Sequence, residues 1–549
     1  MATAQFRKTG SLHPRRNAFD LSYEKKFTCR MGELIPVFHE EMVPGDTFQI
    51  GNESIIRFQP MVAPILHEVT VYTHYFFVPY RILWEHWERF ITGGSDGNDN
   101  TPIPLWPVNL VNNHPIGEHF RNIYSLWDYF GFPVHGYNAH GHGALPLAFP
   151  LRAYNLIFDE YYRDENLQSR TGTAAQFHEP PVSDEWTPSQ LDGNTFGHWP
   201  DESHMPRLRN WTKDYFTSAL PWQLRGVAPA MPLSGNVPVI LEATLAGDPP
   251  AFGRWRVDAN IPATQNPMEL RPHGISSNRT GTGSLWAELG SGVTFDISDI
   301  RRAFQLQKWM ERNARAGVRY IEFLRSHFGV SPRDERLNRP EYIGGSRSAV
   351  TVSEVLQTSE SGGTPQANMA GHGIQAGGNY VGSYKAYEFG IVMGLMSVMP
   401  KPCYEDGINR QWLRRTRFEF YFPEFSHLSE QGITNAEIFA RGNPGDNNIW
   451  GFQGAYDEMR VKNDMVCSEM RVNLNPRYPS LSFWHLGRSF SEVPNLNSAF
   501  VQCNPTTRPF AVHAVGIREA RPLIVNFANL VKAIRPLPSI ATPGLIDHF

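Results

Sequence analysis

The chain has 549 residues, of which 41% are hydrophobic and 19% are charged, and its formal net charge is −4. This composition supplies enough apolar material for a packed core and excludes a chain that is disordered throughout. The longest strongly apolar stretch, Phe389 to Met399, is far shorter than the roughly 20 residues of a membrane span. Residues 1–10 contain no apolar signal segment. We therefore expect neither membrane insertion nor secretion.

The basic residues are distributed unevenly along the chain. Residues 1–30 carry seven basic side chains against two acidic ones, so the pattern predicts a basic N-terminal arm on an otherwise acidic body. Side chains that neutralise phosphates release counterions, which makes such an arm a candidate contact for nucleic acid. A solvated terminus is the alternative interpretation. The candidate DNA-binding residues are Arg7, Lys8, Arg15, Arg16, Lys25 and Lys26.

Strand patterns dominate the first hundred residues. Residues 34–38 form a short apolar run, and in residues 68–78 every second side chain from Val69 to Phe77 is apolar, aromatic or threonine, which predicts a strand with one buried face. Helical spacing follows at residues 82–91 and again at residues 151–164. The segments around the second helix are rich in glycine, proline and asparagine and indicate long loops.

The amino-acid composition changes in the middle of the chain. Residues 223–294 are rich in small and turn-forming residues and contain no lysine, which predicts an inserted surface lobe with at most a small sheet of its own. A helix is then expected from Asp296 or Ser298 to Gly329, with a kink at Gly317. Its expected inward stripe is Ile300, Phe304, Trp309, Met310, Val318 and Ile321.

Strand-like pieces recur in the last third of the chain. They are separated by long intervals, so their pairing requires contacts of the Greek-key kind. The small, polar and glycine-rich residues 359–383 favour a mobile loop. The predicted strands are residues 349–357, 387–399, 417–422, 470–474, 511–517 and 523–534.

Motifs that carry chemistry are scarce. The sequence has no phosphate-binding loop, and its four cysteines (Cys29, Cys403, Cys467 and Cys503) are widely spaced without a CxxC pair. His140 and His142 are the best metal candidates, but surface or interface histidines are the preferred interpretation. The carboxylates from Asp159 to Glu165 are interpreted as a solvated helix face rather than an acid–base pair. We expect no enzyme activity, no metal site and no cofactor.

Several segments nevertheless carry a specific resemblance. In order along the chain, they are similar to the major capsid proteins of microviruses, specifically the gokushovirus branch, and they extend over most of the chain. The matching segments are Gly32–Pro36, Glu41–Thr47, Tyr75–Arg81 with Trp84 and Trp87, Tyr154–Arg163, His327–Val330, Arg336–Gly345, Glu354–Thr358, Tyr404 with Gly407, Ile408 and Trp412, and Trp450–Gln453.

The resemblance implies a mainly β fold: an eight-stranded antiparallel jelly roll over residues 31–549, with long loop insertions and a few helices. It also implies a virion protein of which sixty copies form a T=1 icosahedral shell around the circular single-stranded DNA of a small bacteriophage. The implied partners are internal scaffolding, DNA-pilot and small DNA-binding virion proteins, and assembly is expected in the cytoplasm of the host bacterium.

In that family an extra excursion gathers at the three-fold axes and is proposed to meet a receptor on the host surface. By position, residues 223–294 match it. The candidate attachment residues are Asn236, Arg254, Trp255, Asn278, Arg279 and Trp286. The main rival hypothesis is a β-sandwich carbohydrate-binding protein or glycosidase, whose aromatic side chains would line a sugar cleft.

Overall fold

The computed structural model describes the chain in segments separated by gaps. These segments are residues 15–95, 97, 99, 101–105, 123–134, 146–169, 205–225, 235–239, 285–289, 297–316, 319–356, 369–425, 430–472, 477–511 and 520–540. Two compact units are distinguished in the chain. The larger unit comprises residues 1–223 and 316–549, and the smaller comprises residues 224–315.

A six-stranded antiparallel sheet forms one layer of the larger unit. Its strand order is β1-β16-β4-β10-β9. Strand β2 pairs with the same edge of β16 as β1 does: β1 pairs with the end of β16 and β2 with its beginning. Strand β16, which comes last in the chain, lies between strands that come first, so the sheet is closed by long-range pairing. The strands are β1 (Asn17–Asp20), β2 (Tyr23–Cys29), β4 (Thr47–Phe58), β9 (Thr351–Leu356), β10 (Met369–Lys385) and β16 (Leu523–Arg535).

A four-stranded antiparallel sheet forms the second layer, in the order β3-β11-β5-β8. Its central strand β11 is buried along its whole length. Such a strand reads as a continuous apolar run because both of its faces are covered. The strands are β3 (Ile35–Met42), β5 (Val69–Pro79), β8 (Glu341–Ala349) and β11 (Gly390–Pro400).

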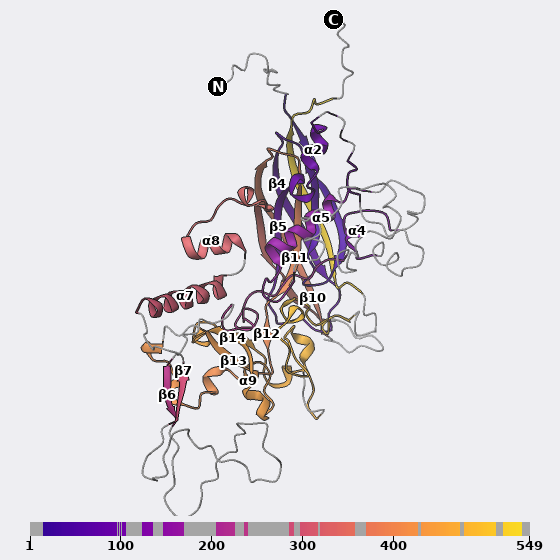
Figure 1. The fold of residues 1–549 in the computed structure, drawn as a ribbon. Helices are drawn as coiled ribbons and strands as arrows, with labels where there is room; N and C mark the ends of the chain where they lie inside the picture. Colours follow the sequence, from indigo (N-terminus) through magenta and orange to yellow (C-terminus); the bar gives the residue numbers. More distant parts are fainter. Residues whose placement is uncertain are drawn as a thin grey trace, which may run out of the picture. The chain divides into compact units, whose positions relative to one another are not determined.

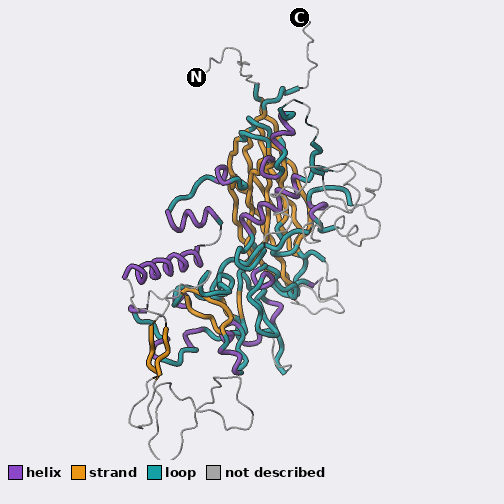
Figure 2. Tube along the Cα trace, in the orientation of Figure 1, coloured by secondary structure: helices purple, strands orange, loops and turns teal. Residues whose placement is uncertain are grey.

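The two sheets pack face to face, as the overlapping layers in Figures 1 and 2 show. One buried cluster joins Val525 and Phe527 of β16 to Val71 of β5 and Met396 of β11. A buried hydrogen bond also crosses between the sheets, from Asn52 Nδ2 of β4 to the Tyr75 hydroxyl of β5, at 3.2 Å. The mainly β, antiparallel architecture is confirmed, and the strand order of the two sheets is consistent with a jelly roll of two Greek keys.

Helices cover the outer face of the four-stranded sheet. Tyr80 and Phe149 stack there with ring centroids 4.4 Å apart, and Trp87 packs edge-to-face against both rings. Figure 1 shows α4 and α5 alongside this sheet. The elements are α1 (Tyr80–Leu83), α2 (Trp87–Thr92), α4 (Leu126–Tyr129), α5 (Phe149–Ile157) and the π-helical turn η3 (Phe158–Tyr162).

A second buried cluster lies below the two sheets in Figure 1 and is built from short elements. They begin with β12 (Cys403–Tyr404), β13 (Glu430–Thr434), α9 (Asn435–Ile438), β14 (Ile449–Gly454), β15 (Asp464–Met465) and α10 (Ser498–Val501). The single-turn 3₁₀ helices of the larger unit are η6 (Asp334–Leu337), η7 (Arg410–Trp412), η8 (Arg417–Glu419), η9 (Pro423–Phe425), η10 (Pro444–Asn447), η11 (Asp457–Met459), η12 (Ser468–Met470) and η13 (Ser482–Trp484).

The smaller unit contains a two-stranded hairpin and a long helix. Strands β6 (Gly235–Val239) and β7 (Leu285–Leu289) pair antiparallel, and α7 spans Ile297–Ala316. In the larger unit, α8 (Tyr320–Phe328) ends at Gly329, which adopts a left-handed conformation. Arg319 before α8 is extended, so residues 296–329 form two helices rather than the single kinked helix that was expected. Gly317 and Val318 lie outside the described residues.

Several other expectations were wrong in detail. The helix expected over residues 82–91 is divided into α1 and α2, because Trp84 is extended and ends the first turn. Of the inward stripe, Met310 is buried but Phe304 and Trp309 are exposed. Residues 417–422 form the 3₁₀ turn η8 and a coil instead of a strand, and residues 470–472 do not form a strand either. Most of residues 511–517 lie outside the described residues.

The mobile loop expected over residues 359–383 was wrong from Met369 onward, because β10 begins there and pairs with both β4 and β9. Residues 359–368 lie outside the described residues. Glycine is required in this strand by close packing. A Cβ added at Gly371 would lie 2.5 Å from the Ala63 carbonyl oxygen, and one at Gly373 would lie 2.6 Å from the Phe58 ring. Glycine in a strand often marks such a close approach.

Candidate functional surfaces

Lys25, one of the proposed DNA contacts, lies on β2 and points into the protein. Its ammonium donates hydrogen bonds to the carbonyl oxygens of Pro36, at 2.7 Å, and of Tyr129. Burial lowers the pKa of Lys25 to about 7. An ammonium held by two carbonyl oxygens and withdrawn from solvent does not reach a phosphate, so the geometry removes Lys25 from the candidate set. Residues 17–29, expected within a free arm, form β1 and β2 of the six-stranded sheet.

The other described basic candidates are exposed. Arg15 and Arg16 precede β1, and Lys26 projects from the opposite face of β2 to Lys25 and forms an ion pair with Glu24 at 2.7 Å. Arg7 and Lys8 lie outside the described residues. Arg15 and Arg16 are neighbours in the sequence and are both exposed. Lys26 lies on the open face of the six-stranded sheet, which is the face turned away from the four-stranded sheet.

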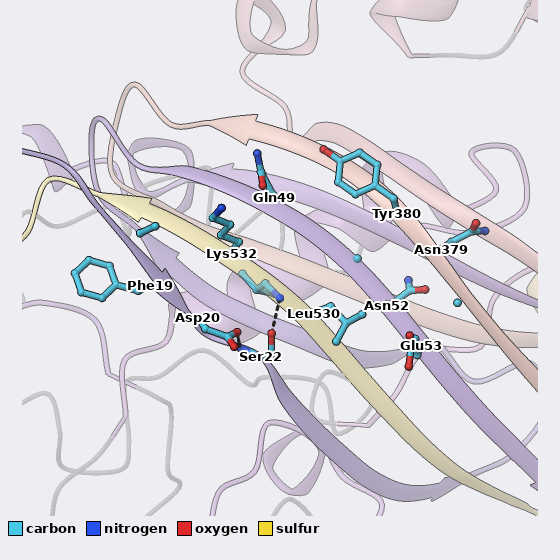
Figure 3. Close-up of a pocket in the computed structure, with 14 residues that line it drawn as sticks. Phe19, Asp20, Ser22, Gln49, Asn52, Glu53, Asn379, Tyr380, Leu530 and Lys532 are labelled. Carbon is cyan, nitrogen blue, oxygen red and sulfur yellow. Dashed lines mark hydrogen bonds between the residues drawn. The ribbon is translucent and has the colours of Figure 1, made fainter. Parts of the chain in front are cut away.

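A shallow hollow of about 810 Å³ lies over this open face, lined by β1, β4, β10 and β16 (Figure 3). Gly51 and Gly378 form the bottom of the hollow, because neither has a side chain to fill the space. Tyr380 and Leu530 are exposed at its margin. The hollow exists because Gly51 of β4 pairs with Tyr380 of β10 and with Leu530 of β16, so a residue without a side chain lies between two large ones.

The charges in the hollow do not suit a phosphate. Asp20 and Glu53 supply two carboxylates against the Lys532 ammonium. Hydrogen bonds from Ser22 lower the pKa of Asp20, which keeps that carboxyl ionised. A surface with excess negative charge repels the nucleic-acid backbone, so the hollow is not a second DNA contact.

The candidate attachment residues are divided between described and undescribed segments. Asn236 lies on β6 opposite Glu288, and Trp286 lies on β7 opposite Pro238. The hairpin register thus places Asn236 and Trp286 on paired strands. The other candidates, Arg254, Trp255, Asn278 and Arg279, lie outside the described residues.

The carboxylates after α5 were wrongly interpreted as a solvated face. Asp159 is only 2% exposed, and Asp164 is also buried. Arg163 contacts Asp159 at 3.8 Å, and Lys213 forms an ion pair with Asp164. The error arose because the π-helical turn η3 changes the helical register and because Lys213 comes from a distant segment. These carboxylates stabilise the fold as ion pairs and do not form an acid–base pair.

The structure also contains a surface that the sequence interpretation missed. The exposed aromatic residues between Trp412 and Phe422 lie on coil and 3₁₀ turns of the larger unit. Their signal was the run Phe418-Glu-Phe-Tyr-Phe422. It was interpreted as a strand.

Metal and membrane sites were sought in the described part of the chain. No cluster of three or more histidine, cysteine or acidic side chains is arranged there to hold a metal ion. None of the helices in these segments is both long and apolar enough to cross a membrane. His140 and His142 lie outside the described residues.

Two antiparallel sheets packed face to face define a β-sandwich protein with long insertions between its strands. Comparison with known proteins identifies the family. The model of the family described as Capsid protein (F protein) matches residues 8–545. The chain therefore belongs to this family, the capsid proteins of small single-stranded DNA phages.

Curated relatives agree with this assignment. The chain is 33% identical to the capsid protein VP1 of Chlamydia phage 1, over 97% of this chain and 96% of the relative. It is 31% identical to the capsid protein VP1 of Bdellovibrio phage phiMH2K, over 99% and 98%. It is 30% identical to the capsid protein VP1 of Spiroplasma virus 4, over 97% and 96%. These relatives are structural capsid proteins of gokushovirus-type microviruses and are not enzymes, so the predicted resemblance is confirmed.

Proposed function

We propose that sixty copies of this chain form a T=1 icosahedral shell around a circular single-stranded DNA genome. The observation that carries the proposal is the similarity to phage capsid proteins over nearly the whole chain. The two-sheet body supplies a stiff wall, because its core is shared by both layers. Each subunit meets several neighbours, so contacts that are individually weak hold the closed shell together. Internal scaffolding, DNA-pilot and small DNA-binding proteins are the proposed partners, and the host cytoplasm is the proposed site of assembly.

The proposed DNA contact consists of Arg7, Lys8, Arg15, Arg16 and Lys26 on the inner surface of the shell. Exposure of Arg15, Arg16 and Lys26 supports it. Contacts of this kind neutralise phosphates and are largely independent of base sequence. The proposal places the start of β1 toward the genome.

The DNA contact is tested by changing Arg15 and Arg16 to alanine in the full chain. The control changes Lys308 and Arg312 of α7, which are also exposed, so both variants lose two positive charges. We expect less nuclease-protected DNA per particle, and a particle stability that depends less on salt, only in the first variant. Equal DNA content and salt dependence in both variants would remove the arm from the proposal.

Residues 223–294 are proposed to project from the shell and to bind a receptor on the host surface. Support comes from the separate compact unit of residues 224–315, which contains the hairpin of β6 and β7. Changing Asn236 and Trp286 to alanine tests this proposal. We expect wild-type particle yield with slower adsorption to host cells. Unchanged adsorption at wild-type yield would argue against these two residues as receptor contacts.

A further inference from the structure

A broad apolar surface on the larger unit is exposed to solvent. We call it the aromatic surface, and its side chains range from 41% exposed at Ile408 to 76% exposed at Met465. Five of its members are aromatic, and Trp412 is the most exposed of these at 71%. The aromatic surface consists of Ile408, Trp412, Phe418, Phe420, Tyr421, Phe422, Met459, Val461 and Met465.

Two groups of side chains lie together within the aromatic surface. Phe418 and Phe422 both lie against Phe425, with ring centroids 6.3 and 5.8 Å apart. Ile408, Val461 and Met465 line a common hollow of about 70 Å³. This hollow is far smaller than the roughly 300–1,000 Å³ of a typical small-molecule site. A hollow of this size can hold one side chain inserted from a binding partner.

Buried ion pairs hold the aromatic surface in place from beneath. Arg414 Nη2 lies 2.9 Å from Glu458 Oε1, and Arg410 Nη1 lies 2.9 Å from Glu437 Oε1. The Arg414 guanidinium also lies over the Phe420 ring, 5.4 Å from its centroid. Along the chain, Arg410 and Arg414 flank Trp412, and Glu458 directly precedes Met459. The segment is thus fixed at its base while its apolar side chains face outward, and a pre-organised surface binds at a lower entropic cost.

The area matches that of a protein interface. An aromatic side chain buries roughly 150–250 Å², so five such residues that are about half-exposed present roughly 500 Å². The four remaining side chains raise the total toward the roughly 800 Å² per partner of a standard interface. The largest apolar patch of a typical monomer covers about 300–600 Å². The aromatic surface is therefore large enough to hold another protein.

We propose that the aromatic surface is buried against a second copy of this chain. The inference rests on the proposed shell, in which the neighbours are further copies. The charges bordering the surface support this occupant, because both signs are exposed there. The basic ones are Arg415, Arg417, Arg460 and Lys462, and the acidic ones are Glu419, Glu424 and Asp464. A rim that carries both signs is typical of protein interfaces, whereas a nucleic-acid site requires a positive excess.

The test uses the full chain expressed with the other virion proteins. One variant changes Phe418, Phe420 and Phe422 to serine. The matched control changes Arg415 and Glu424 to serine, so polar side chains are removed from the same segment. We expect the first variant to lower particle yield about tenfold or more, and the control to stay within about twofold, because core aromatic residues dominate interface energetics. Sedimentation and electron microscopy measure the yield.

Photo-cross-linking identifies the occupant independently of variant folding. Tyr421 is replaced by p-benzoyl-phenylalanine, and the particles are irradiated and digested. We expect cross-links to a peptide of another copy, recognised by mixing isotopically light and heavy subunits. Cross-links only to DNA, to a different protein or within one copy would overturn the inference, as would wild-type yield from the triple serine variant. A wild-type chain that formed no particles would overturn the proposed shell itself.

Discussion

The ion pair between Arg414 and Glu458 offers a quantitative test of how the aromatic surface is held. Their side chains are only 8% and 4% exposed, and Gln431 Nε2 donates to the second Glu458 oxygen at 2.7 Å. Changing Arg414 to methionine leaves this carboxylate buried without its cation. Removal of one partner from a buried pair costs about 3–5 kcal/mol. We expect that loss in the local stability of residues 408–425.

The double variant separates the pair from the individual residues. Changing Arg414 to methionine and Glu458 to leucine together removes both charges, and replacement of a whole buried pair by apolar side chains is often neutral. We therefore expect the double variant to be at least about 2 kcal/mol more stable than the Arg414→Met single variant. Lys401 and Asp464 form the matched control, because their pair is 49% exposed on both sides and is expected to contribute at most about 1 kcal/mol.

Hydrogen exchange of the unassembled subunit is the appropriate assay. A chain of this length with two compact units does not satisfy two-state unfolding, whereas amide exchange reports the opening of one region. The amides of residues 408–425 are followed in all variants. A single variant that loses less than about 1 kcal/mol of local protection, or single effects that add up in the double variant, would refute the reasoning.

Three further predictions concern the two-sheet body, and amide hydrogen exchange of its strands, corrected for the intrinsic exchange rate at each pH, monitors each. Gly32→Ala should cost more than Gly131→Ala: both residues have a positive φ, but only at Gly32 does the new Cβ collide with a backbone atom, the Cys503 carbonyl oxygen. Equal losses would contradict this. Phe527→Ala should cost about 3–5 kcal/mol, because the ring is fully buried between the sheets; a loss below about 1 kcal/mol would mean that the sheets do not share this core. Burial lowers the pKa of His74 to about 4, so as the pH falls from about 6.5 to 4 the unfolded chain gains a proton that the folded chain does not. Stability should fall by up to roughly 3 kcal/mol over that range, and His74→Gln should lose less; identical pH profiles would contradict the assignment.

The sequence predicted the sheets well where each strand carries its own signal. Alternation in β5 and the apolar runs of β11 and β16 located three long strands within a few residues. Strand β10 was missed, because its glycines are required by the Ala63 carbonyl and the Phe58 ring. Those partners come from distant parts of the chain, so composition alone indicated a flexible loop.

The candidate surfaces were predicted less well, because burial depends on tertiary partners. Nothing in the sequence distinguishes Lys25 from the other basic residues of the N-terminal segment. Its burial depends on the carbonyl oxygens of Pro36 and Tyr129, which come from other parts of the chain. Asp159 similarly looked solvated until Arg163 and the π-helical turn enclosed it. By contrast, the resemblance to capsid proteins depended on residue identities in order along the chain, and it identified the family without any of these contacts.

The mass of the assembled particle tests the central claim most directly. Protein produced with its virion partners is purified, emptied of DNA and weighed as intact particles by charge-detection mass spectrometry. Sixty copies of a 62.3 kDa chain predict a shell of about 3.7 MDa. A population that contains only monomers or small oligomers, or closed particles whose mass corresponds to another number of copies, would contradict the account.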